Sequence, residues 1–226
     1  MLYECPDFII LDKPHGTPTV PLKGQDPRGT LLFEAGTLFP EILAVRGRNP
    51  WEGGAIHRLD TATSGLVVFA RTQSFYDHLQ RIQADGLFLK KYRALTRPDE
   101  RLRGTDKDDD LMNGRPATIS SYFRSYGPGA KEVRPTADAK RADSPVLYTT
   151  QVCLEESSDS GDAFICTIAR GFRHQIRAHL AWAGHPICGD VLYGPQVQNP
   201  GKQTLQLDCF EVSFPLPDRK SFVFSR

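Results

Sequence analysis

The sequence predicts an α+β fold, with one large mixed, mainly antiparallel sheet flanked by short helices and loops. Short apolar or alternating runs, which are typical of strands, recur along the whole chain, whereas segments with helical periodicity are few and short. Glycine and proline clusters separate these segments. No internal repeat and no linker interrupts the 226 residues, so we expect a single domain over residues 1–226.

The first predicted elements lie on either side of a turn rich in proline and glycine. Residues 8–12 are apolar and predict a short buried strand, and Lys13-Pro14-His15-Gly16-Thr17-Pro18 forces a turn directly after it. A short helix is predicted over residues 30–35, ended by Gly36, and another helix begins at Pro40.

The clearest helix follows an apolar strand at residues 66–70. Phe75, Leu79 and Ile82 recur at i, i+4 and i+7 within residues 73–84, which gives this segment one apolar face. Thr72 or Ser74 can cap the start of the helix, and Gly86 ends it.

The second half of the chain is predicted to contain most of the sheet. Residues 88–96 alternate with period two, which puts Lys90, Tyr92 and Ala94 on one face of a strand. The charged stretch 97–114 predicts a solvated, mobile loop. One further helix and several strands are predicted downstream: strands 117–124, 146–154, 163–169, 205–214 and 221–224, and helix 174–183.

Composition limits the class of protein and its compartment. The hydrophobic content of 39% and the net charge of +1 describe an ordinary globular protein, and they neither indicate nor exclude a nucleic-acid partner. Five scattered cysteines without a Cys-x-x-Cys pair argue against a disulfide framework or a zinc ribbon. The sequence has no signal peptide and no apolar run of membrane-spanning length. We therefore expect a cytoplasmic protein without membrane contact.

Two polar segments contain the side chains that are best suited to take part in catalysis or binding. His57-Arg58-Leu59-Asp60 enters a turn of small polar residues just before the strand at 66–70, so a loop fixed to rigid scaffold presents Asp60. Far downstream, Gly171-Phe172-Arg173-His174-Gln175-Ile176-Arg177 opens the helix at 174–183. Its apolar stripe is Ile176, Leu180 and Ala183, with Arg177 about 100° to the side. His174 and His179 are five residues apart, which does not suit a shared metal site.

Together these segments resemble the RluA-type branch of the RNA pseudouridine synthases. The resemblance covers nearly the whole chain and includes the Lys-Pro-x-Gly turn at residue 13, the segment Lys91-Tyr92-Arg93-Ala94-Leu95, and residues 185–194. It implies the catalytic domain of that family, with an active cleft across the sheet. We expect no room in this chain for the accessory RNA-binding domain that many relatives carry at the N-terminus. The implied reaction converts uridine to pseudouridine in structured rRNA or tRNA, without cofactor or metal, after the nucleotide is flipped out of its helix.

The resemblance assigns the catalytic roles to Asp60, Tyr92 and Arg177. Asp60 matches the family's catalytic aspartate, as nucleophile or electrostatic stabiliser, and attack on the sugar, attack on the base and elimination through a glycal all stay open. Arg177 matches the arginine that pairs with this aspartate and keeps it ionised. Tyr92 matches the residue that stacks on the flipped uracil.

Four further residues are expected to contact RNA. Arg58 would fill the space left by the flipped base, His57 would support the Asp60 loop or touch a phosphate, and Arg173 and His174 would contact RNA at the start of the downstream helix. The chain has Phe172 where relatives have an arginine, and its own arginine, Arg173, comes one place later and is expected to point elsewhere. Residues 46–51 and 122–141 are the candidate surface for target recognition.

Two other functions compete with this interpretation. A catalytically inactive RNA-binding module would have no need of Asp60 facing phosphate, and a hydrolase using Asp60 with His57 lacks a serine or cysteine elbow and a metal set. We therefore expect an RNA enzyme, acting as a monomer with no obligate protein partner.

Overall fold

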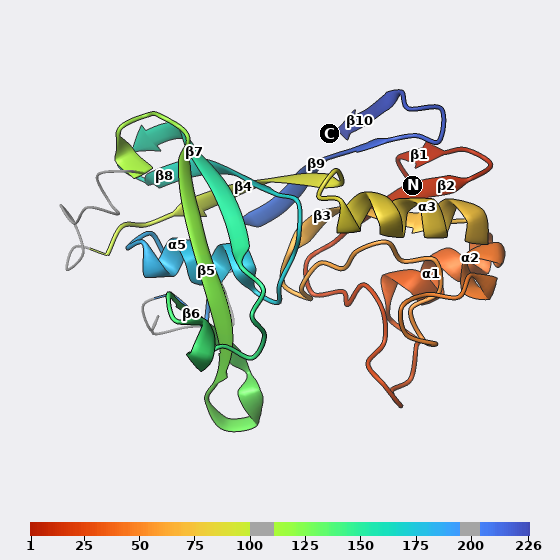
Figure 1. Ribbon diagram of the computed structural model, residues 1–226, viewed down its shortest axis with the longest axis horizontal. Coiled ribbons are helices and arrows are strands. Elements are labelled where there is room, and N and C mark those ends of the chain that lie inside the picture. Colours follow the sequence, from red (N-terminus) through yellow and green to blue (C-terminus); the bar gives the residue numbers. More distant parts are fainter. Residues whose placement is uncertain (100–110, 195–203) are drawn as a thin grey trace. The chain divides into compact units, whose positions relative to one another are not determined.

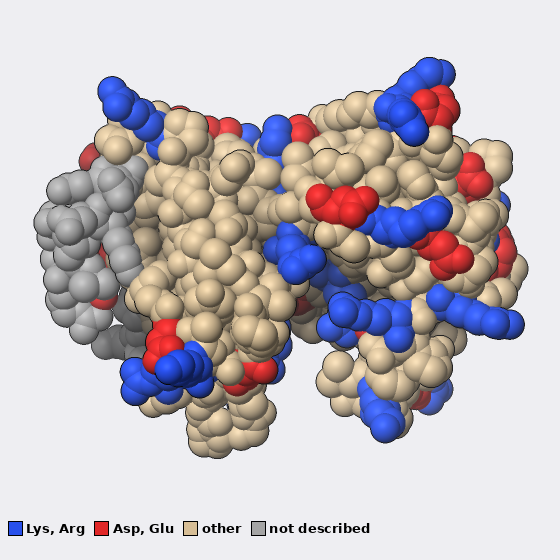
Figure 2. All heavy atoms as spheres, in the orientation of Figure 1, with Lys and Arg blue, Asp and Glu red and all other residues tan. Residues whose placement is uncertain are grey.

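The computed structural model describes residues 1–99, 111–194 and 204–226 and confirms the α+β fold (Figure 1). The chain divides into two compact units, residues 1–89 with 209–226 and residues 90–208. Figure 2 shows basic and acidic side chains interspersed over the visible surface, in keeping with the net charge of +1. Within the described residues, no helix is both long and apolar enough to span a membrane.

The first unit contains a sheet in the order β1-β2-β3-β9, with β10 paired to β9. The pairs β1–β2, β2–β3 and β9–β10 are antiparallel. Every residue of β3 is buried, which explains its continuous apolar run. The bounds of these strands are Tyr3–Glu4 for β1, Phe8–Lys13 for β2, Ser64–Ala70 for β3, Leu207–Pro215 for β9 and Ser221–Ser225 for β10.

Three helices accompany this sheet in the described part of the first unit: α1 (Leu31–Leu38), α2 (Glu41–Ala44) and α3 (Gln73–Ala84). Helix α3 has the predicted bounds and packs on β3. The Thr72 hydroxyl accepts a hydrogen bond from the Phe75 amide, and Gly86 adopts a positive φ of 74° just beyond the helix. Stacked and edge-on phenylalanine rings fill the core: Phe8, Phe75, Phe88, Phe214 and Phe222.

The predicted end of α1 is wrong, because the helix continues through Gly36 to Leu38. A side chain at position 36 would clash with Leu43, whose carbon atoms lie 2.7–2.9 Å from the place of a Cβ. Gly36 therefore lies within α1 beside the Leu43 side chain and does not terminate the helix.

The second unit contains an antiparallel sheet in the order β4-β8-β7-β5-β6. Helix α5 (Gln175–Trp182) contacts β6 and β7. Two 3-10 turns, η2 (Pro128–Ala130) and η3 (Ala139–Arg141), flank β6. The strands are β4 (Leu89–Thr96), β5 (Ala117–Tyr126), β6 (Glu132–Thr136), β7 (Tyr148–Ser158) and β8 (Gly161–Ile168).

Two features of this unit differ from the prediction. The sequence did not indicate β6, which contains a proline and two charges but pairs with β5 and buries Val133 completely. Helix α5 is buried from Gln175 through Leu180, Arg177 included, so it lacks the predicted single apolar stripe. Most of the loop predicted at 97–114 falls on residues 100–110, which lie outside the described residues.

Candidate active site

Asp60 lies half-buried in a loop whose backbone is held on both sides. Its carbonyl accepts a hydrogen bond from the Thr63 amide at 3.0 Å, which closes the turn. The Thr19 hydroxyl bonds both the amide and the carbonyl of Leu59, each at 3.0 Å. The residue before Asp60 is thus fixed to a segment 40 positions earlier in the chain.

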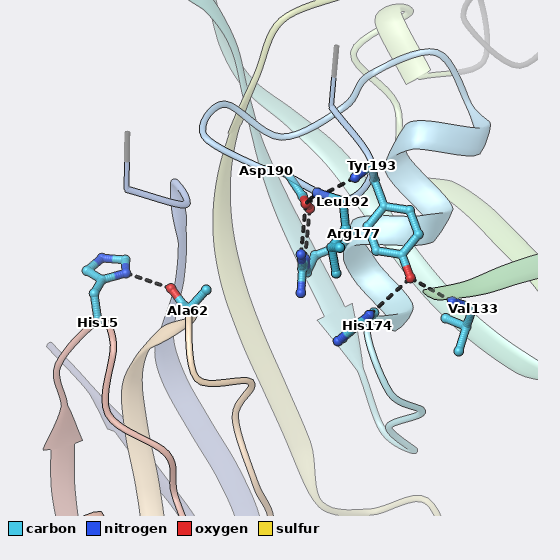
Figure 3. A network of polar contacts seen from close by, with 8 residues as sticks. All are labelled: His15, Ala62, Val133, His174, Arg177, Asp190, Leu192 and Tyr193. Atoms are coloured by element: carbon cyan, nitrogen blue, oxygen red, sulfur yellow. Dashed lines mark hydrogen bonds and ion pairs between the residues drawn. The ribbon is translucent and has the colours of Figure 1, made fainter. Parts of the chain in front are cut away.

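The turn after β2 holds the other side of the Asp60 loop. The Gly16 amide donates to the Thr61 carbonyl at 2.9 Å, and His15 Nδ1 bonds the Ala62 carbonyl at 2.7 Å (Figure 3). The Lys-Pro-x-Gly turn and the Asp60 turn therefore form one hydrogen-bonded structure.

Lys13 joins these two turns and is fully buried. Its ammonium donates to the carbonyls of Pro14, Thr17 and Thr61 at 2.9, 2.7 and 3.1 Å. Burial lowers the pKa of Lys13 to about 8, although the negative charges of Asp60 and Asp12 oppose this shift. A buried cation that interacts electrostatically with Asp60 was not among the predicted site residues. The sequence feature that could have indicated Lys13 is its place directly after the apolar strand at residues 8–12.

His57 and Arg58 also make contacts within the first unit. The Val68 amide donates to His57 Nε2 at 3.3 Å, so this nitrogen acts as an acceptor and the ring braces the loop against β3. Arg58 Nη1 donates to the buried carboxylate of Glu52 at 2.9 Å, and its side chain is 55% exposed. These contacts agree with the supporting role expected of His57, and the RNA contacts of both residues stay predictions.

Arg177 forms a bidentate ion pair with Asp190 inside the second unit (Figure 3). Arg177 Nε and Nη2 lie 2.7 and 2.8 Å from the two carboxylate oxygens of Asp190, and both side chains are buried. Asp190 also accepts hydrogen bonds from the amides of Leu192 and Tyr193. Asp190 was not a predicted site residue, and pairing of Arg177 with Asp60 stays a prediction.

Tyr193 connects the first turn of α5 to β6. Its hydroxyl accepts from the Val133 amide at 2.9 Å and lies 3.0 Å from His174 Nδ1 (Figure 3). Burial raises the pKa of Tyr193, so the phenol keeps its proton at neutral pH and can donate it to His174. His174 has a left-handed conformation with φ of 55° directly before the helix, an uncommon and strained state for this residue.

The polar side chains behind Arg177 form a buried hydrogen-bond network. His179 is completely buried, and its two ring nitrogens lie 2.9 Å from the Ser121 hydroxyl and 2.8 Å from the Thr150 hydroxyl. Gln175 donates to the same Thr150 hydroxyl and to the Thr149 carbonyl. His179 is therefore a structural residue that ties α5 to β5 and β7. Across the described residues, no cluster of three or more histidine, cysteine or acidic side chains is arranged to hold a metal ion.

Comparison with known proteins gives the family. Residues 7–182 match the family model described as RNA pseudouridylate synthase. The chain belongs to this family. It is 28% identical to RNA pseudouridine synthase 7 of Arabidopsis thaliana over 85% of this chain and 44% of the relative. It is also 28% identical to ribosomal large subunit pseudouridine synthase D of Xylella fastidiosa, over 88% and 53% of the two chains. These relatives confirm the predicted resemblance to the RluA-type branch.

A solved structure shares the fold. Human RNA pseudouridylate synthase domain containing 1 superposes with a TM-score of 0.72 at 19% identity, over 100% of this chain and 81% of that chain. The chain spans about half the length of the two curated relatives named above.

The departure from the family motif at Phe172 has a packing explanation. In this pseudouridylate synthase family member, Phe172 stacks on Phe123 with ring centroids 4.9 Å apart and also contacts Tyr148. Arg173, one place later, donates from Nη2 to the carbonyls of Ala130 and Glu132 at 2.6 and 3.1 Å. Position 172 thus fills an apolar cluster, and Arg173 holds the turn before β6.

Tyr92 lies on the buried face of β4 together with Lys90, Ala94 and Thr96. It is 5% exposed and stands opposite Cys166 of β8 in the antiparallel pair. Lys90, Tyr92 and Ala94 share one face of the strand, as the alternation predicts, and the stacking of Tyr92 on a uracil stays a prediction.

Proposed function

We propose that this chain isomerises uridine to pseudouridine in structured RNA, either rRNA or tRNA, with Asp60 as the catalytic carboxylate. Family membership supports the reaction class. The observation that carries the assignment to Asp60 is the set of hydrogen bonds from Lys13, Gly16 and Thr19 to the loop on both sides of it. They fix its backbone while the side chain keeps partial exposure, the arrangement that a positioned reactive group needs.

The proposed reaction is a balanced isomerisation. The glycosidic bond between C1′ and N1 of a flipped uridine breaks, the uracil turns, and C5 forms a new bond to C1′. The proton on C5 is released, and N1 takes one up. Asp60 stabilises or attacks the nucleotide during bond cleavage, and Tyr92 stacks on the uracil and holds it while it turns. No redox equivalent and no group donor is needed.

Arg177 is proposed to hold Asp60 in its ionised form and in one orientation. A guanidinium can do this because it stays charged at every physiological pH and offers donors on more than one edge. The ion pair with Asp190 engages Nε and Nη2, which fixes the plane of the guanidinium. His57 and Arg58 are proposed to support the loop and contact the RNA, and Arg173 and His174 to contact it from the start of α5.

Release of tritium from C5-labelled uridine in total RNA tests this proposal, because C5 loses its hydrogen only when the new bond forms. Asp60→Asn removes charge at nearly constant volume and should slow the reaction by several orders of magnitude, about 4 kcal/mol or more of barrier. Asp26→Asn is the matched control, since Asp26 is exposed and pairs only with Arg28 within the described residues.

The outcomes separate the competing functions. Tritium release that depends on Asp60 and not on Asp26 supports the proposal. The substrate for this test is RNA that lacks the modification. Binding of this RNA without any release of tritium would favour the inactive binding module instead. Release by Asp60→Asn at more than a small fraction of the wild-type rate would remove Asp60 from the mechanism.

A further inference from the structure

The outer face of the β5–β6 hairpin places two arginines directly opposite each other. Arg124 and Arg134 are register partners in the antiparallel pair, and Tyr122 and Tyr126 flank Arg124 on the same face. The other face turns Phe123 and Val133 into the core, where they pack with α5. The hairpin thus has an apolar inner side and a basic, aromatic outer side.

The two arginines gather around one exposed aromatic ring. The Arg134 guanidinium lies 3.2 Å from the centroid of Tyr126, and that of Arg124 lies 5.8 Å from it. Tyr126 is 40% exposed. Cation–π contacts of this kind hold a guanidinium flat against a ring while its N–H edges stay available for an anion.

This arrangement has an electrostatic cost. Like charges directly opposite each other destabilise an antiparallel pair. Within residues 1–99, 111–194 and 204–226, no carboxylate forms an ion pair with Arg124 or Arg134, although Glu132 shares their face. Two cations held together, neither of them in an ion pair with a carboxylate of the described residues, form a candidate site for an anionic ligand.

The hairpin is held in shape from three sides. The Asp143 carboxylate accepts from the amide and hydroxyl of Ser125, Arg173 holds the carbonyls on either side of residue 131, and the Tyr193 hydroxyl holds the Val133 amide. The outer face therefore needs little ordering when it binds a ligand, which favours affinity.

We propose that the outer face of the hairpin, formed by Tyr122, Arg124, Tyr126 and Arg134, binds unpaired nucleotides of the RNA substrate. The arginines contact consecutive phosphates, and Tyr126 with Tyr122 offers ring surface to the bases. A backbone-tracking basic groove interleaved with aromatic rings is the general solution for single strands, whereas a duplex hides its bases from such rings. This inference rests on the proposed function and names its substrate class: a uridine next to a single-stranded segment. The inner face of the hairpin packs on α5, the helix that carries Arg177. RNA bound to the outer face is therefore held on an element that contacts this helix.

Fluorescence anisotropy with a labelled oligouridylate of about 12 nucleotides, and with a blunt RNA duplex of equal length, tests the proposal. The double variant Arg124→Gln/Arg134→Gln should bind the single strand about tenfold more weakly at about 0.1 M salt. The slope of log affinity against log salt is negative, and its magnitude should decrease by about 1.4 in this variant. This is about 0.7 for each of the two phosphates that the variant no longer neutralises. The control Arg219→Gln/Lys220→Gln removes the same charge from the exposed turn between β9 and β10 and should change binding less than about twofold.

The tyrosine separates base stacking from charge. Tyr126→Leu should weaken oligouridylate binding about fivefold or more and leave duplex binding unchanged, whereas Tyr126→Phe should bind like the wild type. Equal decreases in affinity for the two double variants, or equal decreases for duplex and single strand, would overturn the proposal. Thermal unfolding of each variant verifies that the hairpin has kept its structure.

The binding assay does not depend on catalysis. If the wild type binds oligouridylate through this face but releases no tritium, the proposed isomerase function fails and the surface stands. If tritium is released while the arginine variant binds like its control, the surface fails and the function stands.

Discussion

Replacing Arg177 with methionine should destabilise the protein by about 3 kcal/mol. The Asp190 side chain has no exposed surface, and the guanidinium supplies hydrogen bonds to both of its carboxylate oxygens. Without Arg177, a buried carboxylate retains the amides of Leu192 and Tyr193 as donors but has no counter-charge. Breaking one side of a buried pair costs about 3–5 kcal/mol, and the remaining amide donors place this case at the lower end.

Urea unfolding at about pH 7.5 measures the effect. The double variant Arg177→Met/Asp190→Leu removes both charges and should be more stable than Arg177→Met alone. A destabilisation below about 1 kcal/mol for Arg177→Met, or additive effects in the double variant, would refute the reasoning.

Arg173→Ala is the matched comparison on the same helix start. Arg173 is exposed and donates to two backbone carbonyls, so its removal should cost about 1 kcal/mol. In single-turnover kinetics, Arg177→Met should slow the chemical step, whereas Arg173→Ala should weaken RNA binding in a salt-dependent way and leave turnover of bound RNA nearly intact. If Arg173→Ala abolishes the chemical step and Arg177→Met spares it, the catalytic assignment of Arg177 is wrong.

Three further perturbations test other parts of the molecule. The pKa of Lys13 is about 8 in the folded protein and about 10.5 in the unfolded chain, so the unfolded chain binds more protons between these two pH values. The free energy of unfolding of the wild type, compared with that of Lys13→Met, should therefore rise with pH over this range, by up to about 3 kcal/mol in urea unfolding. Gly65 has φ of 119°, and a Cβ at this position would lie 2.3 Å from the Cys209 carbonyl oxygen. Gly65→Ala should therefore lower the free energy of unfolding by about 3 kcal/mol or more. Position 24 has open space around it, and Gly24→Ala should cost only about 1 kcal/mol. Chelator should leave tritium release unchanged, and a requirement for added zinc would contradict the expected metal-free reaction.

The sequence by itself determined the elements whose cause is local. Helix α3 has the predicted bounds because its cap, its apolar spacing and its terminating glycine all lie within the segment. The alternation in β4 likewise placed Lys90, Tyr92 and Ala94 on one face, and the fold decided that this face is the buried one. The motifs around Asp60 and Arg177 were enough to indicate the family, since a family pattern is read from residue types and order.

Only the tertiary structure decided which distant partners meet. The local sequence predicts a helix end at Gly36, whereas in the fold α1 continues past it to Leu38 and Leu43 lies against this glycine. Strand β6 has little strand character of its own and forms because β5 supplies its hydrogen bonds and α5 covers Val133. Phe172 interrupts the family motif because Phe123, 49 positions earlier, offers it an aromatic surface.

The same distinction holds for the candidate site. Lys13 joins two turns because its ammonium reaches a carbonyl 48 residues away, and Asp190 fixes Arg177 from a loop beyond the end of α5. The sequence placed Arg124 and Arg134 within the candidate recognition surface at residues 122–141, and the hairpin register then set these two arginines opposite each other on one face. Hydrogen bonds and ion pairs between distant segments depend on where the folded chain brings those segments. Local residue patterns therefore do not predict which distant residues will be in contact.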